Sequence, residues 1–572
     1  MTKDEVASIL EDIGLLLELK GENPFKTRAY LNAAHSLQTL PEDLALMVKE
    51  KRLGSIRGIG DALQEKITTL VETGSLPYYN DLKASLPAGL PALMDIPGLG
   101  PKKLKVFFDK LGVDDLAKLE AACRDGRVAE LPGMGEKTAE NILAGISQRQ
   151  LYSGQHRYGD VIERAEELLD WMRSHPDIIR LGLAGSIRRG KEIIKDIDLV
   201  GSSKNPEAVM ADFVEHPDVE RILGQGSTKS SILLMDGIQC DLRLVEDANF
   251  AAALLHFTGS KEHNVALRQR AIARGLKLSE YGLCSEDQTK EKGNRFFPDE
   301  GSLYQRLDLE FIPPELRENM GEIEASEKGE LPRLLEWGDL KGCFHNHTTE
   351  SDGRDSLRRM AEGAASVGLD YFGIADHSKS SVQARGLSEE RLLKQVEEIR
   401  ALNKELEEIH LFAGVECDIL KDGSLDYEDE VLAQLDYVVA SVHSSFTLSE
   451  KDMTRRIRKA MENPHVYMIG HLTGRLLLER ESYDLNIPEI LKAAAETGTW
   501  IELNANPYRF DLDWRWWKQA RDLGVKCVIN PDAHSVNQIG YLKLGAQIAR
   551  KGWLRKQDVI NTLTLEQVKK LL

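Results

Sequence analysis

The sequence lacks paired cysteines, hydrophobic runs of membrane-spanning length and any excess of positive charge. Its six cysteines lie far apart with no C-x-x-C pair, which predicts free, mostly buried thiols in a reducing cytosol. No stretch of about 18 apolar residues occurs, so we expect no membrane span. The start, MTKDEVASILEDIGLLLELKG, is typical of an amphipathic helix and lacks the apolar core of a signal peptide. We therefore expect a cytoplasmic protein.

The chain is acidic, with a net charge of −19 over 572 residues. This charge argues against a generally basic coat for nucleic acid, although it leaves local contacts open. The length suggests three or four domains, and an apolar content of 42% is sufficient for ordinary cores.

A pair of aspartates, Asp196 and Asp198, follows the turn GSIRRG at 185–190, and Asp241 lies in a second strand-like run. Residues i and i+2 of a strand point to the same face, so the paired carboxylates lie side by side. Such carboxylates repel one another unless cations lie between them. D-x-D alone is a weak signal, because many loops carry it at random.

The turn before the aspartates makes the pattern more specific. Gly185 and Ser186 let backbone amides approach a phosphate, and Arg188 and Arg189 add positive charge. Together with the carboxylates, this predicts a nucleotidyltransferase site that binds two Mg²⁺ or Mn²⁺ ions for an in-line displacement.

From about residue 20 to 317 the chain resembles a family X DNA polymerase. GSIRRG with DID, then CDLRL, then FTGSKEHN at 257–264, follow that family's order and approximate spacing. The resemblance implies that Asp196, Asp198 and Asp241 hold the catalytic metals. It implies that Gly185, Ser186 and Arg189 contact the triphosphate of the incoming nucleotide, and that Phe257, Thr258 and Gly259 line the sugar pocket. It also implies that Asn264 faces the edge of the new base pair and that Arg243 steers closure of the active site.

One position departs from that family. His256 stands where the well-known members carry tyrosine, so the resemblance leaves discrimination against ribonucleotides open for this chain. A partly exposed histidine at a helix end is the alternative interpretation of this residue.

Residues 1–150 are helical in pattern and repeat a Gly-x-Gly loop before three helices. This is the helix-hairpin-helix form, in which glycines and a helix N-terminus let backbone amides approach a DNA phosphate without reading base sequence. A tight helix–helix turn is the alternative for any single copy. The expected DNA-binding glycines are Gly58, Gly60, Gly98, Gly100, Gly133 and Gly135.

Lys66 lies six residues after Gly60 and matches the lysine that forms a Schiff base in family X lyase domains. That chemistry needs a neutral amine. A second family lysine is replaced by Ala62, and a solvated lysine on a helix face is the alternative interpretation.

Beyond a charged segment at about 317–339, short β-rich runs alternate with helical patterns, which predicts parallel strands in a barrel-like α/β domain. Potential metal ligands recur at the ends of those strands, where such barrels place their chemistry. Histidines with bridging carboxylates suit Zn²⁺ or Mn²⁺, up to three ions. The nine candidates are His345, His347, Asp352, His377, Glu416, His443, His471, Asp532 and His534.

The half from about 337 to 572 resembles the polymerase and histidinol phosphatase (PHP) domain. HNH, SDG, ADH, GVE, VH, GH and DAH occur in that family's order, and the ligand set is complete. The resemblance implies phosphoester hydrolysis, and fusion to a polymerase implies 3′–5′ exonuclease activity, with abasic-site endonuclease or 3′-phosphatase action as further candidates. Arg509 is a candidate phosphate contact.

The expected fold is therefore multidomain: all-α hairpin regions, an α+β nucleotidyltransferase palm and thumb, and a C-terminal distorted β/α barrel. The expected ranges are 1–80 lyase-like, 81–150 fingers-like, 151–247 palm, 248–317 thumb, 318–336 linker and 337–572 PHP. We expect a nucleoid-associated monomer that fills short gaps in base excision repair, with gapped or primer–template DNA and dNTPs as partners. A small-molecule phosphatase tethered to a polymerase, and a non-catalytic PHP scaffold, remain the competing hypotheses.

Overall fold

The computed structural model describes residues 1, 3–38, 40, 44–56, 58–87, 89–96, 99–285 and 297–572. It divides into two compact units, Met1–Ser153 and Gly154–Leu572. All six cysteines are free and five of them are buried, as the sequence predicts. A search of the described helices finds none that is both long and apolar enough to span a bilayer.

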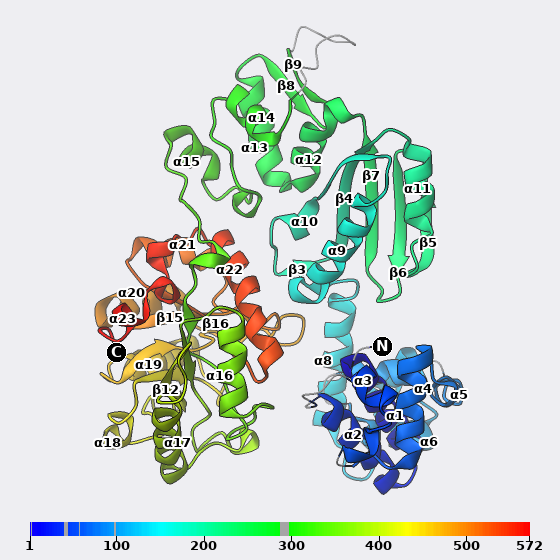
Figure 1. Ribbon diagram of the computed structural model, residues 1–572, viewed down its shortest axis with the longest axis vertical. Coiled ribbons are helices and arrows are strands. Elements are labelled where there is room, and N and C mark those ends of the chain that lie inside the picture. Colours follow the sequence, from blue (N-terminus) through cyan, green and yellow to red (C-terminus); the bar gives the residue numbers. More distant parts are fainter. Residues whose placement is uncertain are drawn as a thin grey trace. The chain divides into compact units, whose positions relative to one another are not determined.

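The first unit is helical, with two separate clusters of buried apolar side chains. Figure 1 shows its helices in blue to cyan. They are α1 (Lys3–Lys20), α2 (Pro24–Gln38), α3 (Leu44–Lys49), α4 (Asp61–Thr73), α5 (Pro77–Ala84), α6 (Pro101–Leu111), α7 (Leu116–Arg124) and α8 (Glu136–Leu151).

The second unit begins with a five-stranded sheet in the order β2-β4-β7-β6-β5, in which only β4 and β7 are parallel. Polar and buried apolar residues alternate along the start of β4 and along β7, so one face carries the acids while the other packs on the core. The elements are β1 (His156–Arg157), α9 (Tyr158–Arg173), β2 (Ile178–Leu183), α10 (Gly185–Arg188), β3 (Ile193–Ile194), β4 (Asp196–Ser203), α11 (Pro206–Val214), β5 (Val219–Gln225), β6 (Lys229–Leu234) and β7 (Gln239–Val245).

A smaller subdomain follows the sheet. It comprises α12 (Phe250–Thr258), α13 (Lys261–Ile272), β8 (Leu276–Ser279), β9 (Gly282–Ser285), α14 (Glu300–Arg306) and α15 (Glu322–Lys328). Helix α15 lies inside the segment expected as a linker, and its Glu322 is fully buried against the Nδ1 atom of His263 at 2.6 Å. This connection is therefore folded onto the preceding helices.

The C-terminal part has seven parallel strands in chain order, as the alternating pattern predicts: β10 (Gly342–Cys343), β11 (Tyr371–Ile374), β12 (His410–Asp418), β13 (Tyr437–Ser441), β14 (Val466–Ile469), β15 (Trp500–Asn504) and β16 (Cys527–Asn530). The strands are buried almost throughout, because helices cover the outside of a parallel sheet. A bridge between Asn346 and Ala533 joins the segments that follow the first and last strands, so the barrel is nearly closed.

The covering helices are α16 (Leu357–Ser366), α17 (Glu389–Leu402), α18 (Asp429–Leu432), α19 (Glu450–Met461), α20 (Ile487–Thr497), α21 (Trp514–Asp522), α22 (Tyr541–Lys551) and α23 (Leu565–Val568). Figure 1 shows α16 and α17 in green and α21 and α22 in orange to red.

Candidate active sites

All nine ligand candidates of the barrel lie at the carboxyl-terminal ends of its strands and form one cluster. They fall into four overlapping groups whose ligand atoms lie within 4.8 Å of one another. The two histidines of HNH follow β10 directly, at the strand end where the sequence predicts the ligands. The backbone turns sharply at His471 and Asp532, where positive φ angles of 25° and 52° hold both side chains in the cluster.

Glu416 on β12 lies at the centre of the cluster, with an exposed fraction of 1%. Its carboxylate is 2.8 Å from His471 Nε2, 2.9 Å from His377 Nδ1 and 3.2 Å from His443 Nε2. His345 Nε2 lies at 3.3 Å from the same group. One carboxylate that faces several imidazoles can bridge neighbouring cations.

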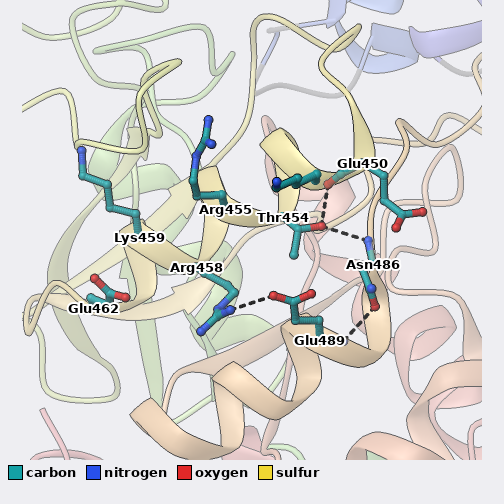
Figure 2. Close-up of a pocket in the computed structure, with 9 residues that line it drawn as sticks. Glu450, Thr454, Arg455, Arg458, Lys459, Glu462, Asn486 and Glu489 are labelled. Atoms are coloured by element: carbon teal, nitrogen blue, oxygen red, sulfur yellow. Dashed lines mark hydrogen bonds and ion pairs between the residues drawn. The ribbon is translucent and has the colours of Figure 1, made fainter.

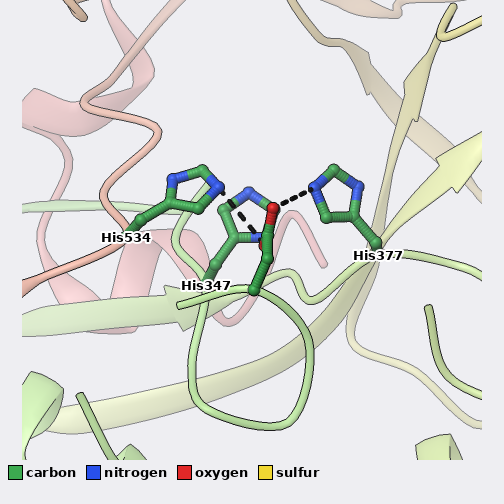
Figure 3. Close-up of side chains that lie close together, drawn as sticks. His347, His377 and His534 are labelled. Carbon is green, nitrogen blue, oxygen red and sulfur yellow. Dashed lines mark ion pairs between the residues drawn. The ribbon is translucent and has the colours of Figure 1, made fainter. Parts of the chain in front are cut away.

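Asp352 and Asp532 complete the cluster on its other side. The Asp352 carboxylate lies 3.3 Å from His534 Nε2 and 3.6 Å from His377 Nε2, and Asp532 lies 3.1 Å from His347 Nε2. Figure 3 shows the imidazoles of His347, His377 and His534 facing one another from three different segments of the chain.

The buried nitrogens of the cluster fit metal ions. Four imidazole nitrogens of the cluster are buried without a hydrogen bond of good geometry: His345 Nε2, His347 Nδ1, His377 Nδ1 and His471 Nδ1. Two of them, His345 Nε2 and His377 Nδ1, face the Glu416 carboxylate at 3.3 and 2.9 Å. An unsatisfied buried polar atom is costly, and a cation would satisfy each of them. Imidazole and carboxylate together suit Mn²⁺ or Zn²⁺.

The electrostatics of the cluster also favour cations. Burial alone would raise the pKa of Glu416, yet the surrounding histidines, led by His443, hold it well below its usual range. Burial alone would lower the pKa of His443, but Glu416 and Asp418 raise it to about 9. The carboxylates thus remain ionised beside protonated imidazoles, and a bound cation would take the place of those protons.

Two carboxylates that sequence reasoning missed support these histidines. Glu502 on β15 is fully buried and lies 2.7 Å from His345 Nδ1, and Asp418 lies 2.9 Å from His443 Nδ1. Such partners orient a ligating imidazole and raise its basicity. The sequence feature that could have identified Glu502 and Asp418 is an acidic residue within an otherwise apolar strand. Arg509 lies at the edge of the cluster, with its Nε atom 3.6 Å from Asp532.

The palm acids lie together on two parallel strands. Asp198 on β4 is the register partner of Asp241 on β7, and Asp196 is two residues earlier on β4. Burial, followed by the charges of its two neighbours, raises the pKa of Asp198 to about 7. This mutual repulsion is what cations would relieve.

The palm acids are less convergent than those of the barrel. No palm carboxylate belongs to a group of three ligands within 4.8 Å, in the part of the chain that the structure describes. Asp241 instead pairs with the Lys229 ammonium at 2.5 Å, a contact that the sequence did not suggest. The three palm acids therefore stay predicted ligands.

The turn predicted to bind phosphate packs directly on the acids. Gly185 has a φ of +60°, and a Cβ atom at this position would lie 2.0 Å from Asp198 Oδ2. Only glycine fits there. Arg188 is bound to Glu300, and Arg189 Nε donates to Glu318 at 2.9 Å.

The other predicted nucleotide contacts lie at the end of α12 and the start of α13. The Arg243 guanidinium stacks 4.5 Å from the Phe257 ring centroid, and Thr258 is fully buried. Gly259 caps α12, and the Asn264 amide donates to the carbonyl of His256 at 2.7 Å. The His256 ring contacts Phe257, with ring centroids 5.0 Å apart.

Comparison with known proteins identifies the domains and the family of the chain. Family models match for a helix-hairpin-helix domain (1–76), a SAM-like helix-hairpin-helix tandem (90–147), a DNA polymerase beta thumb (253–318) and a PHP domain (344–506). The chain is 38% identical over 575 residues to the DNA polymerase/3′-5′ exonuclease PolX of Bacillus subtilis, covering 100% of this chain and 99% of that protein. The chain belongs to the family X DNA polymerases with a C-terminal PHP domain.

Two further relatives each match part of this family X chain. Rat DNA polymerase lambda is 22% identical over 347 residues, covering 54% of this chain and 55% of that protein. A probable phosphatase of Thermoanaerobacter sp. is 27% identical over 229 residues, covering 38% of this chain and 89% of that protein.

The hairpin glycines of this family X chain precede helices with open N-termini. Gly60 caps α4, Gly100 caps α6, and Gly135 directly precedes α8. A Cβ atom at any of these three glycines would meet nothing within 4 Å, and the same holds for Gly58 and Gly133. This space suits the close approach of a phosphate to the backbone. Gly98 lies outside the described residues.

Lys66 lies on α4, with its ammonium 5.0 Å from the Tyr78 ring centroid and 3.3 Å from the Ala62 carbonyl. Lys26 lies over the same ring at 5.9 Å. A second cation near the lysine is in keeping with its predicted lyase role, which stays a prediction.

The PHP part of this family X chain also has a groove of about 640 Å³ between α19 and α20 (Figure 2). Its lining carries both signs of charge, and Arg458 pairs with Glu489 across it at 2.7 Å. None of its lining residues is a candidate metal ligand. The groove is therefore distinct from the cluster.

Proposed function

We propose that this chain is a DNA-directed DNA polymerase that fills short gaps during repair, with a 3′–5′ exonuclease in its PHP domain. The relative in Bacillus subtilis, which is named for both activities and matches over the full length, supports this assignment. The observation that carries the proposal is the convergence of all nine barrel ligands beside a separate set of palm acids on parallel strands.

In the palm, Asp196, Asp198 and Asp241 would hold two Mg²⁺ or Mn²⁺ ions. The turn at Gly185 presents backbone and arginine donors to the triphosphate, and the buried end of α12 shapes the sugar pocket. In the barrel, the nine ligands would hold up to three Mn²⁺ or Zn²⁺ ions, and Arg509 would orient the phosphate at the edge of the cluster. Bound cations supply Lewis-acid chemistry for phosphoester substitution in both sites.

Separate sites predict separable activities. The variant Asp198→Ala/Asp241→Ala should lose nucleotide addition on gapped DNA but keep Mn²⁺-dependent degradation of a 3′ end. Asp236→Ala, in the turn between β6 and β7, is a matched control and should keep both activities. Joint loss of both activities in a folded palm variant would refute independent sites.

A small-molecule phosphatase is a second candidate for the barrel, favoured by its similarity to the probable phosphatase. Histidinol phosphate and 3′-ended DNA should be compared as substrates of the same preparation. Preferred hydrolysis of DNA supports the exonuclease, and abasic or 3′-phosphate ends in the same assay test the further candidate activities. Preferred hydrolysis of histidinol phosphate supports the phosphatase.

A further inference from the structure

The segment that follows the phosphate-binding turn contacts the PHP domain at three successive places. These contacts come from residues 189–192 on the palm side and from α21 and α22 on the barrel side. The two sides are separated by more than 300 residues in sequence. The turn that would bind dNTP is therefore held from outside the polymerase core.

The central contact is Lys551, the last residue of α22, which is fully buried. Its ammonium donates to the backbone carbonyl of Arg189 at 3.0 Å and to the Glu318 carboxylate at 2.7 Å. It also lies 4.4 Å from the ring centroid of Trp514. A buried ammonium must be paired, and here its partners belong to the polymerase half.

Two neighbouring contacts fix the same segment. A Cβ atom on Gly190 would lie 3.0 Å from the Gln547 side chain of α22, so this side chain packs directly on the Gly190 backbone. Glu192 accepts hydrogen bonds from Trp514 Nε1 at 2.8 Å and from Arg515 at 3.0 Å. The segment is thus bound on both sides of Gly190.

The contact of Lys551 with Glu318 changes the net charge beside Arg189, which is a predicted triphosphate contact. The Glu318 carboxylate is shared by two cations, because it accepts from Arg189 Nε at 2.9 Å and from Lys551 at 2.7 Å. One negative and two positive charges leave a net positive charge beside the turn. Without Lys551, Glu318 would neutralise Arg189 alone.

We propose that Lys551 of the PHP domain is a positioning residue for dNTP binding in the palm, since it fixes the Arg189 backbone and preserves the net positive charge of the turn. This inference rests on the proposed polymerase function. The PHP domain then contributes to nucleotide addition through its fold, independently of its own hydrolytic chemistry.

The test compares Lys551→Met with the matched control Lys543→Met, an exposed lysine on the same helix. We expect Lys551→Met to raise the KM for dNTP at least about five-fold while kcat changes less than about two-fold. Binding of a non-hydrolysable dNTP, measured by titration, should weaken by the same factor. The rate at which Lys551→Met degrades a single-stranded 3′ end should match that of the wild type. In the control Lys543→Met, both nucleotide addition and 3′-end degradation should match the wild type.

The double variant Lys551→Met/Glu318→Gln separates charge from general damage. It removes the uncompensated carboxylate and restores the net positive charge, so the dNTP KM should return at least halfway to the wild-type value. If Lys551→Met does not fold, Trp514→Phe serves as the test variant instead. This substitution removes the hydrogen bond to Glu192 while it keeps an aromatic ring at the position. It should raise the dNTP KM and leave the exonuclease unchanged.

An unchanged dNTP KM in folded Lys551→Met, no recovery in the double variant, or parallel loss of exonuclease activity would overturn the inference. If Trp514→Phe is the variant tested, an unchanged KM for dNTP would also overturn the inference. Failure of the wild-type protein to add nucleotides would instead refute the proposed function itself, so the two failures are distinguishable.

Discussion

At the scale of single residues, the barrel site depends on side chains that contact ligands as well as on the ligands themselves. Glu502 accepts from His345 Nδ1 and from the backbone amide of His471, and the amides of Asn504 and Asn530 also donate to it. Its position is thereby fixed by four donors. The imidazole of His345 is oriented in turn, with Nε2 facing Glu416.

Glu502→Gln should therefore weaken the barrel site without affecting the palm. Loss of such a carboxylate typically costs about 10- to 100-fold in metal affinity or activity. We expect a drop of that size in Mn²⁺ affinity, measured by titration, and in 3′-end degradation, with unchanged primer extension. Glu496→Gln, on the exposed face of α20, is the control. Unchanged Mn²⁺ affinity in Glu502→Gln would contradict this role.

In the palm, the predicted site depends on Gly185 as the barrel site depends on Glu502. Gly185→Ala places a methyl group against Asp198 and forces a left-handed backbone on a residue with a side chain. Primer extension should fall by at least about ten-fold, since each 1.36 kcal/mol of barrier is one order of magnitude. Gly182→Ala serves as control, because its Cβ would meet only Leu254 at an ordinary 3.6 Å. Equal activity in both variants would show that the turn tolerates a side chain.

At the scale of elements, the helix N-termini after the hairpins are predicted phosphate contacts. Gly100→Ala/Gly135→Ala adds methyl groups in open space, so the fold should persist. Affinity for gapped DNA should fall several-fold, by about 1 kcal/mol, and the slope of log affinity against log salt should become shallower. Gly540→Ala, which also changes an open glycine before a helix, should bind DNA as the wild type does. Wild-type affinity and slope in the double variant would exclude these hairpins from the interface.

The sequence predicted the elements whose signals are local. Histidines and acids that recur at strand ends identified the nine barrel residues that the structure brings together, and D-x-D with CDLRL predicted neighbouring strands. Glu502 and Asp418 were missed, because an acid within a buried strand has no spacing signal. The contact of Lys551 with Arg189 was missed because no local pattern connects residues so distant in sequence.

The buried Lys551 of helix α22 makes the free energy of unfolding depend on pH. Burial lowers the pKa of Lys551 to about 8, although Glu318 opposes the shift and Arg189 adds to it. Between about pH 8 and 10.5 the unfolded chain holds one more proton at this lysine than the folded chain, so stability rises with pH. The free energy of unfolding of the wild type, measured by chemical denaturation at each pH, should rise relative to that of Lys551→Met between pH 7.5 and 10, by on the order of 2 kcal/mol. A constant difference would contradict the shift.

At the scale of the whole molecule, an acidic chain carries a cluster of histidines and carboxylates in the barrel and three neighbouring acids in the palm, and cations would stabilise both. The net charge is −19, and six of the nine barrel ligand candidates are buried. Ions that bind the folded chain more tightly than the unfolded chain stabilise it, by about 2.7 kcal/mol at a hundred times the dissociation constant. Metal binding should therefore be coupled to the stability of the barrel.

Chelation should lower the melting temperature of the wild-type protein by about 5–10 °C, because 1 kcal/mol shifts a domain of this size by about 2–4 °C. The variant His377→Ala/Asp532→Ala removes a ligand from each side of the cluster and should show almost no further shift with chelator. Asp198→Ala/Asp241→Ala retains the barrel ligands and should respond like the wild type. An equal response in all three proteins would mean that the barrel cluster is not the stabilising metal site, since only the first variant lacks its ligands.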